Sequence, residues 1–201
     1  MEPTMSALKN HLQRFYAISD EDFEKVSVYF SIREFKPREF LIKEQEMEEN
    51  VFFVVKGVLR KFFRRDKHEV VTQFYLEGDF AHAAVSFYTG EPSIYSIEAI
   101  EPTVCLSLRK VDFEKMLDEV PGFEKLYRRV LTNLYVKKDL NEYRKARQSK
   151  KERFLNFCKE QPDLLQRIPQ KYLASYLEMA PETFCRLKHV RYSEAKRASS
   201  Y

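Results

Sequence analysis

The chain has 201 residues, 44% of them hydrophobic and 33% charged, and a formal net charge of +4. This length is enough for one medium-sized domain with a buried core and one small domain. No run approaches 18 consecutive apolar residues, which excludes a membrane-spanning helix. The first 16 residues lack the basic-then-apolar pattern of a secretory signal, so we expect a cytoplasmic protein.

Cysteine and histidine spacing gives no sign of a metal site. Cys105, Cys158 and Cys185 are far apart and have no CxxC spacing, so we interpret them as reduced structural thiols. The four histidines show no i,i+4 pairing with one another or with a cysteine, and we expect no zinc or iron–sulfur cluster. No nucleophile motif or phosphate loop is present, and we do not expect an enzyme.

The first half of the chain predicts two helices followed by short strands. Residues 6–29 have helical spacing, and Ser19-Asp-Glu-Asp22 has the form of a capping box. The next segments are rich in β-branched and aromatic residues, which is typical of strands: 30–35, 39–43, 50–56, 57–63, 69–75, 93–100 and 103–109. The four glycines fall at breaks between elements, where a positive φ or a close backbone approach is expected. This pattern predicts a sandwich or rolled barrel.

The next part of the chain is expected to be helical. Residues 111–120 predict a short helix and 123–146 a long one, whose first half carries a broad apolar stripe. The stripe is wide enough to face both the β domain and a second copy of the chain, so we predict dimerisation. The alternative is a helix packed only on its own domain. Polar residues after Leu140 mark a hinge, and a helix around 150–160, with Phe154, Leu155 and Cys158 inward, follows.

Residues 168–191 predict two short helices joined by a tight turn. Pro169 and Pro181 suit the first turns of the two helices. Proline fixes φ at a helical value, and the N–H that it lacks has no partner within the first turn of a helix. The predicted inner positions are Leu173, Leu177, Phe184, Leu187 and Val190. This leaves Glu182, Thr183 and Arg186 on the outer face of the second helix, a chemistry suited to reading the DNA major groove. An ordinary helical corner with a surface Glu182–Arg186 ion pair is the alternative.

Charge is distributed unevenly between the two parts of the chain. Residues 141–201 contain 14 lysine and arginine residues against 7 acidic ones, a net charge of +7, whereas residues 1–140 have a net charge of −3. A basic segment around a two-helix motif, joined to an acidic body, is typical of a nucleic-acid reader attached to another domain.

In this order, the segments resemble the Crp–Fnr superfamily of bacterial transcription regulators, in a variant found in Bacteroidetes-type members. The resemblance rests on NVFFVVKGVLRKF with Gly57, EGDF at 77–80, residues 90–108 and residues 169–188. It implies an α+β fold: an N-terminal antiparallel β-roll, or jelly roll, of the cyclic-nucleotide-binding type at 1–120, a dimerisation helix and hinge at 121–147, and a helix-turn-helix domain with a basic tail at 148–201.

The resemblance also implies which residues contact DNA. Glu182 and Arg186 fall where the family reads bases, the carboxylate accepting from cytosine and the guanidinium donating to guanine. Thr183 and Gln170 are expected to contact the phosphate backbone of the DNA. Gln170 lies at the positive end of a helix dipole, which favours such a contact. The full expected set is Gln170, Lys171, Glu182, Thr183, Arg186, Lys188 and Arg191.

Three residues depart from the family pattern. Pro181 occupies the position of a base-contacting arginine, which predicts a different preferred sequence. Glu178 replaces the usual glycine of the turn, where a left-handed conformation adds strain. Ala180 replaces the usual Ser/Thr cap, a loss of about 1 kcal/mol. The sequence after the recognition helix suggests a basic, partly disordered tail in place of a β-wing.

The cyclic-nucleotide cassette of the family is altered. Ala83 stands at the position of the ribose-binding carboxylate and Ser93 at that of the phosphate-binding arginine. A cyclic phosphate buried without its cation would lose several kcal/mol, so we expect no cyclic AMP or GMP and no other cofactor. An altered effector pocket is expected at His82, Ala83, Ser86, Tyr88, Ser93 and Tyr95. The alternative is a ligand-free scaffold filled by these side chains.

The sequence as a whole predicts a homodimeric, sequence-specific DNA-binding transcription regulator whose partners are double-stranded DNA and RNA polymerase. The alternative is a small-ligand-sensing or protein-interaction module with a weakened helix-turn-helix. The operator, the regulated genes, the effector and the choice between activation and repression are not encoded in any motif.

Overall fold

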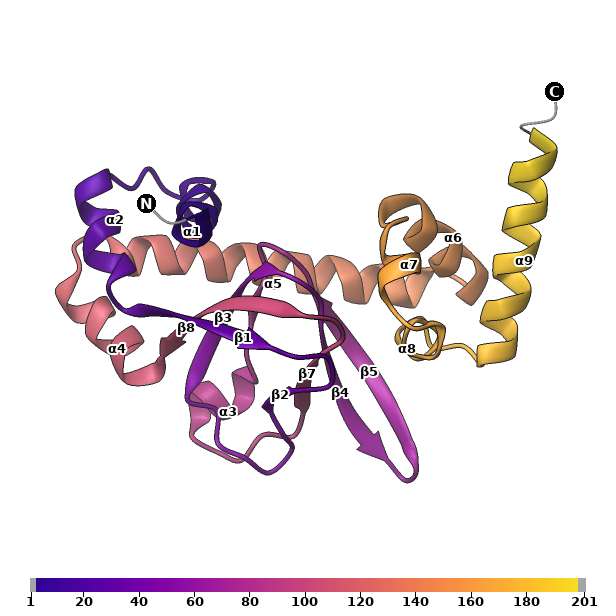
Figure 1. Cartoon of the computed structure of the whole chain (residues 1–201), viewed down its shortest axis with the longest axis horizontal. Helices are drawn as coiled ribbons and strands as arrows, with labels where there is room; N and C mark the ends of the chain where they lie inside the picture. Colours follow the sequence, from indigo (N-terminus) through magenta and orange to yellow (C-terminus); the bar gives the residue numbers. More distant parts are fainter. Residues whose placement is uncertain (1–2, 199–201) are drawn as a thin grey trace. The chain divides into compact units, whose positions relative to one another are not determined.

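The computed structural model describes the backbone of residues 3–198 and the side chains of residues 3–190. The chain divides into two compact units, one of Met1–Phe63 with Gln73–Lys137 and the other of Arg64–Thr72 with Lys138–Tyr201. Figure 1 shows both units and labels their elements except β6. None of the helices in the described part of the chain has a stretch long and apolar enough to cross a bilayer.

The first unit is built on a β-roll of two antiparallel sheets, as the strand pattern predicts. One sheet has the order β1-β8-β3-β6 and the other β2-β7-β4-β5. The strands are β1 (Phe30–Phe35), β2 (Phe40–Ile42), β3 (Asn50–Lys56), β4 (Leu59–Arg65), β5 (His68–Tyr75), β6 (Phe80–Ala81), β7 (Ser96–Ala99) and β8 (Thr103–Arg109). The α+β class and the jelly-roll architecture expected from the sequence are confirmed.

Strand β3 separates the two hydrophobic cores of this unit. Phe52 and Val54 face the cluster inside the roll, whereas Val51 and Phe53 face the cluster on the other side of the sheet. This alternation follows from the two-residue period of a strand, and burial on both faces explains why NVFFVVK reads as a continuous apolar run. The outer cluster is completed by residues of α1 (Pro3–Gln13), α2 (Asp20–Ser27), α4 (Lys110–Glu119) and the first part of α5 (Phe123–Arg147).

Gly57 makes the tight connection between β3 and β4 possible. Its φ is +108°, and a Cβ added to it would lie 2.3 Å from Thr103 Oγ1. Both the left-handed backbone and the contact with β8 therefore require glycine. The expectation of a positive φ holds for the other three glycines as well.

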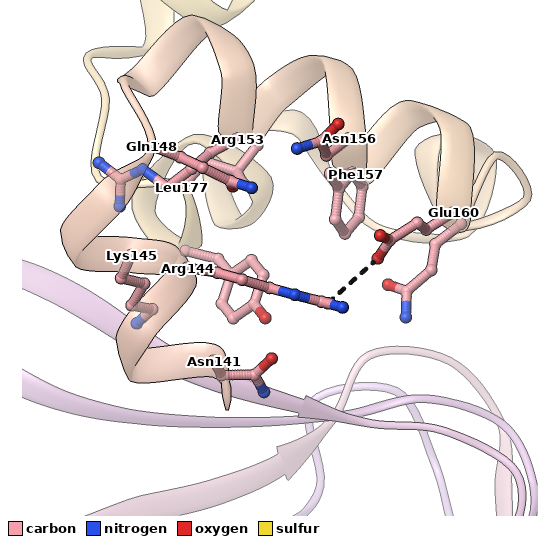
Figure 2. A pocket seen from close by; sticks show the side chains of 11 residues that line it. Asn141, Arg144, Lys145, Gln148, Arg153, Asn156, Phe157, Glu160 and Leu177 are labelled. Carbon is pink, nitrogen blue, oxygen red and sulfur yellow. Dashed lines mark ion pairs between the residues drawn. The ribbon is translucent and has the colours of Figure 1, made fainter. Parts of the chain in front are cut away.

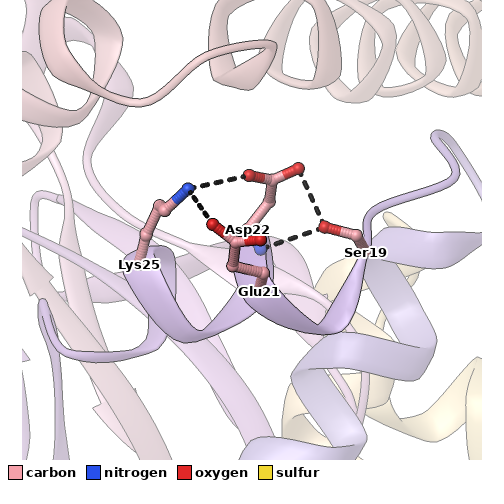
Figure 3. A network of polar contacts seen from close by, with 4 residues as sticks. All are labelled: Ser19, Glu21, Asp22 and Lys25. Carbon is pink, nitrogen blue, oxygen red and sulfur yellow. Dashed lines mark hydrogen bonds and ion pairs between the residues drawn. The ribbon is translucent and has the colours of Figure 1, made fainter.

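The start of α2 confirms the expected cap at Ser19 (Figure 3). Ser19 Oγ accepts a hydrogen bond from the backbone N–H of Asp22 and donates one to the Asp22 carboxylate. In a complete capping box, the Asp22 carboxylate would accept a hydrogen bond from the Ser19 backbone N–H. Here it accepts from the Ser19 hydroxyl instead. Lys25 pairs with Glu21 at 3.0 Å and with Asp22 at 3.4 Å, which closes the network at the surface.

The sequence pattern missed two short helices, α3 (Ala84–Thr89) and α7 (Leu164–Arg167), together with the two-residue strand β6 before α3. The residue before α3 is Ala83, which offers no side-chain cap, and six residues are too few for a periodic pattern. The end of α3 is signalled by Gly90, whose φ is +73°.

The second unit contains the expected two-helix motif. Its helices are α6 (Lys150–Glu160), α7 (Leu164–Arg167), α8 (Gln170–Tyr176) and α9 (Pro181–Ala198), and α6 begins with a complete Ser149/Glu152 capping box. Phe154 and Phe184 are both buried and stack edge to face, with ring centroids 5.3 Å apart. A segment of the β4–β5 hairpin completes this unit, since Ser175 Oγ accepts from Val71 N and donates to Glu69 O.

Three local expectations in this unit were wrong. Val190 is 47% exposed and Leu155 is 42% exposed, although both were expected to face inward. Val190 lies six residues after the buried Phe184, which at 100° per residue turns it 120° away, toward the side of Glu182 and Arg186. The expected irregular tail is instead a continuation of the second helix of the motif, since α9 extends to Ala198.

Candidate functional site

The turn between α8 and α9 is tight although it contains no glycine. Glu178 has a φ of +56°, the left-handed conformation expected at this position. Met179 is buried in the turn, and its N–H donates to Ala174 O. Helix α9 begins directly after Ala180, whose carbonyl accepts from Phe184 N. The sequence therefore forms the helix-turn-helix geometry without its usual glycine and cap.

Two cations hold the side chain of Glu178. Arg153 Nη1 donates to its carboxylate at 2.9 Å, and Lys145 Nζ lies 3.7 Å away. The Arg153 hydrogen bond lowers the pKa of the Glu178 carboxyl below its usual value. A glycine at this position could not make these contacts, so the side chain offsets part of the strain of its backbone.

A cavity of about 220 Å³ lies beside this pair (Figure 2). Figure 2 shows Arg144 extending toward Glu160, and their charged groups are 3.7 Å apart. Arg153 also lines the cavity, and its side chain is only 11% exposed. The ion pairs therefore connect the end of α5 with α6 and with the turn that positions α9.

The residues expected to contact DNA lie on both helices of the motif. Gln170, Lys171, Glu182 and Arg186 are exposed, Thr183 and Lys188 are partly buried, and the side chain of Arg191 lies outside the described residues. Glu182 and Arg186 are one turn apart on the first two turns of α9, so their side chains share one face. The structure thus brings Glu182 and Arg186 together on an exposed surface.

Gln170 at the start of α8 is tied to α9. Its Oε1 accepts a hydrogen bond from Cys185 Sγ at 3.4 Å. Cys185 is exposed and carries no other role in the sequence analysis. The contact keeps the first turn of α8 close to the first two turns of α9, where Glu182 and Arg186 lie.

The six residues expected to form an effector pocket make several different sets of contacts. Ala83 and Ser86 contact Glu48, a buried carboxyl that no sequence pattern points to: Ala83 N donates to Glu48 Oε2, and Glu48 N donates to Ser86 Oγ. Ser93 Oγ donates to Tyr95 O and accepts from Tyr95 N, so this pair stabilises its own turn. Four of the six residues therefore serve local structure.

Glu48 is the most unusual carboxyl of the roll. Its side chain accepts from the backbone N–H groups of Ala83 and Asn50, each at 3.1 Å. Burial raises its pKa to about 7, although these hydrogen bonds oppose the shift. Near neutral pH this group is balanced between its neutral and charged forms.

The buried cation of the roll is already paired. Arg60 and Glu98 face each other on β4 and β7 and form an ion pair at 2.8 Å. Arg60 is 2% exposed and also lies over the Phe62 ring at 3.9 Å. Because its charge is compensated by Glu98, Arg60 is a poor substitute for the arginine that a cyclic phosphate would require.

The remaining two expected residues, His82 and Tyr88, line an apolar cavity of about 60 Å³ between the roll and the helices. Its other walls come from α1, β1, β3, β6, β8, α4 and α5: Leu12, Phe30, Val51, Phe80, Leu108, Phe113, Phe123, Leu126, Tyr127, Val130, Leu131 and Leu134. The α5 residues are the apolar stripe that the sequence analysis identified. Their contribution to a cavity was not foreseeable, because stripe residues usually fill a core.

Among the residues that the structure describes, no three histidine, cysteine, aspartate or glutamate side chains are grouped so that they could hold a metal ion.

Comparisons with known proteins agree with this architecture. The family model of the cyclic nucleotide-binding domain matches residues 32–120. The c-di-GMP-responsive global regulator CLP of Xanthomonas campestris superposes with a TM-score of 0.69 at 11% identity, over 88% of this chain and 93% of that chain. FixK2 of Bradyrhizobium japonicum gives 0.67 at 20% identity, over 83% and 86%. The catabolite activator protein of Thermus thermophilus gives 0.50 at 19%, over 92% and 88%.

No curated protein sequence matches the chain. The match to the family model covers less than half of the chain. The chain shares the fold of these three solved structures.

Proposed function

We propose that this protein is a homodimeric, sequence-specific DNA-binding transcription regulator that does not respond to cyclic AMP or GMP. The observation that carries the proposal is the exposed pair Glu182 and Arg186 on the first turns of α9, in a helix-turn-helix with a net positive charge. A carboxylate and a guanidinium on one helix face can read cytosine and guanine edges in the major groove.

The apolar surface of α5 supports the dimer. Leu131, Tyr135, Val136 and Leu140 are 37%, 72%, 48% and 49% exposed in the single chain. Exposed aromatic and aliphatic side chains along one long helix are typical of a surface that a partner covers. A second copy of α5 would bury them and would present two recognition helices to one duplex.

The composition of the altered cassette supports the absence of cyclic-nucleotide binding. Ala83 has no carboxylate for a ribose hydroxyl, and the Ser93 hydroxyl is engaged by its own turn. Arg60 would have to leave Glu98 to reach a phosphate. None of these three residues therefore offers a charge that could neutralise a charged ligand.

Gel-shift experiments on selected DNA test the base-reading role. Arg186→Ala should lose about 1–3 kcal/mol of discrimination at one base pair, because a bidentate contact to guanine is removed. Lys171→Ala should weaken binding about equally for all sequences, as expected for a phosphate contact. Arg128→Ala, on the exposed face of α5, is the matched control and should leave the affinity unchanged.

An equal loss on all sequences for Arg186→Ala would show that this residue contacts only phosphate. If the wild-type protein has no preferred DNA at all, the chain would instead be a ligand-sensing or protein-interaction module with a degenerate helix-turn-helix.

A further inference from the structure

We propose that the tip of the β4–β5 hairpin, residues 64–68, is a second DNA-contacting surface that binds backbone phosphates beside the groove read by α9. The proposal rests on the proposed function. It extends the contact surface to a segment outside the helix-turn-helix, more than 100 residues earlier in the chain.

The first argument is that the hairpin tip is attached to the helix-turn-helix. Arg64–Thr72 groups with Lys138–Tyr201 in one compact unit, whereas the rest of β4 and β5 belongs to the other unit. Ser175 on α8 accepts a hydrogen bond from Val71 N at 3.0 Å and donates one to Glu69 O at 3.1 Å. Two hydrogen bonds to one side chain fix the place of β5 on α8, so the tip is held beside the helices that meet DNA.

The second argument is the charge of the hairpin tip. Its sequence, RRDKH, contains three arginine or lysine residues and one aspartate, a net charge of +2. The other residues of 1–140 have a net charge of −5, so the tip is a basic patch in an acidic part of the chain. All five side chains of the tip are exposed. An exposed basic patch next to a DNA-reading helix is suited to a polyanion.

The third argument is the position of the tip along α8. Lys171, an expected phosphate contact, lies four residues before Ser175, so the two side chains share one face of this helix. Arg65 and Lys67 are four and two residues from Glu69, which places them at most about 13 Å and about 7 Å along an extended strand from the α8 contact. This position beside Lys171 favours DNA over an acidic protein surface as the partner of the tip.

Contacts from the tip would strengthen binding without adding sequence preference. Lysine and arginine side chains that bind phosphates position a protein on the duplex, whereas base contacts specify the sequence. The tip and α9 would therefore have separable roles, affinity for the first and base discrimination for the second.

Salt titration of DNA binding by the full-length protein tests the proposal, with a duplex that the wild-type protein has selected from a random pool. Arg65→Gln/Lys67→Gln should reduce the slope of log K against log salt concentration by about 2, because each lost phosphate contact removes about 0.9. The affinity at about 0.1 M salt should fall about tenfold or more. The preferred sequence should stay the same, in contrast to Arg186→Ala.

Two further variants control for structure and for net charge. Arg65→Lys/Lys67→Arg keeps both charges and should retain the wild-type affinity and slope. Lys36→Gln/Arg38→Gln removes the same charge from the exposed turn between β1 and β2, which belongs to the other unit, and should leave the slope unchanged.

The proposal is overturned if Arg65→Gln/Lys67→Gln keeps the wild-type slope, a result that would leave the tip free for an acidic protein surface. It is also overturned if Lys36→Gln/Arg38→Gln reduces the slope equally, since net charge alone would then explain the loss. Either result leaves the proposed function intact, because the wild-type protein still selects its DNA. A wild-type protein that binds no DNA would contradict both proposals.

Discussion

At the residue scale, Glu178 shows how a departure from a family pattern can be compensated. A left-handed conformation costs a residue with a Cβ roughly 1–2 kcal/mol, a cost that glycine avoids. In return, the Glu178 carboxylate pairs with Arg153 and Lys145, two of the residues that line the cavity of Figure 2. Partly exposed ion pairs contribute about 0–1 kcal/mol each, so the two effects nearly balance.

This balance predicts which of two variants at position 178 is the more stable. Glu178→Ala keeps the strained backbone and loses the ion pairs, whereas Glu178→Gly loses both the pairs and the strain. We expect the glycine variant to be about 1 kcal/mol more stable than the alanine variant and close to wild type. Urea denaturation of the three proteins measures this, and equal stability of the two variants would show that the turn is not strained.

Glu48 predicts a pH dependence of stability. Its pKa is about 7 in the folded protein against 4.5 in the unfolded chain. The folded state therefore retains a proton that the unfolded state has lost, so the contribution of Glu48 is fully present below pH 4.5 and is lost as the pH rises through 7. The buried His82 acts in the opposite direction, since its pKa is lowered to about 4 and its contribution is lost as the pH falls below 6.5.

Glu48→Gln isolates the first effect, because the His82 titration is common to both proteins. Between pH 4.5 and pH 8 the wild-type protein should lose up to about 3 kcal/mol of unfolding free energy relative to the variant. Denaturation curves at several pH values give this difference. A constant difference across the range would mean that Glu48 has the same pKa in the folded and the unfolded protein.

At the element scale, the sequence predicts elements with strong periodicity and misses those that depend on tertiary context. The long strands and α5 follow from alternation and from the 3.6-residue period. Helix α3 is too short to show a period. Val190 was wrongly predicted to face inward because it follows Phe184 and Leu187 at intervals of three residues. A helix has 3.6 residues per turn, so each such interval rotates the side chain further from the buried face.

The candidate sites show the same limit. Glu182 and Arg186 could be selected because an exposed pair at i,i+4 is a local pattern. The division of the expected effector residues into a Glu48 cluster, a turn and an apolar cavity depends on contacts between distant segments. The same holds for Ser175, which meets the β4–β5 hairpin more than 100 residues earlier in the chain.

The exposed apolar residues of α5 predict that self-association depends on this helix. Val136→Asp places a charge on the proposed dimer surface and should shift the protein from dimer to monomer at micromolar concentration. Val111→Asp is the matched control, because Val111 on α4 is 61% exposed and should tolerate the same change. Analytical ultracentrifugation separates the cases, and a dimer that persists in Val136→Asp would remove α5 from the interface.

At the scale of the whole molecule, the two parts of the chain have net charges of opposite sign. Residues 141–201 have a net charge of +7 and residues 1–140 a net charge of −3. If the chain binds DNA as proposed, the basic C-terminal part would make the contacts with phosphates, and such contacts release counterions. The affinity for DNA should therefore fall steeply as the salt concentration rises.

The most direct measurement is selection of bound duplexes from a random DNA pool by the purified full-length protein. A dimer with two helix-turn-helix motifs should enrich a two-fold symmetric sequence whose half-sites are about 34 Å, or one helical turn, apart. Enrichment of a single unpaired half-site, or no enrichment at any salt concentration, would contradict the account.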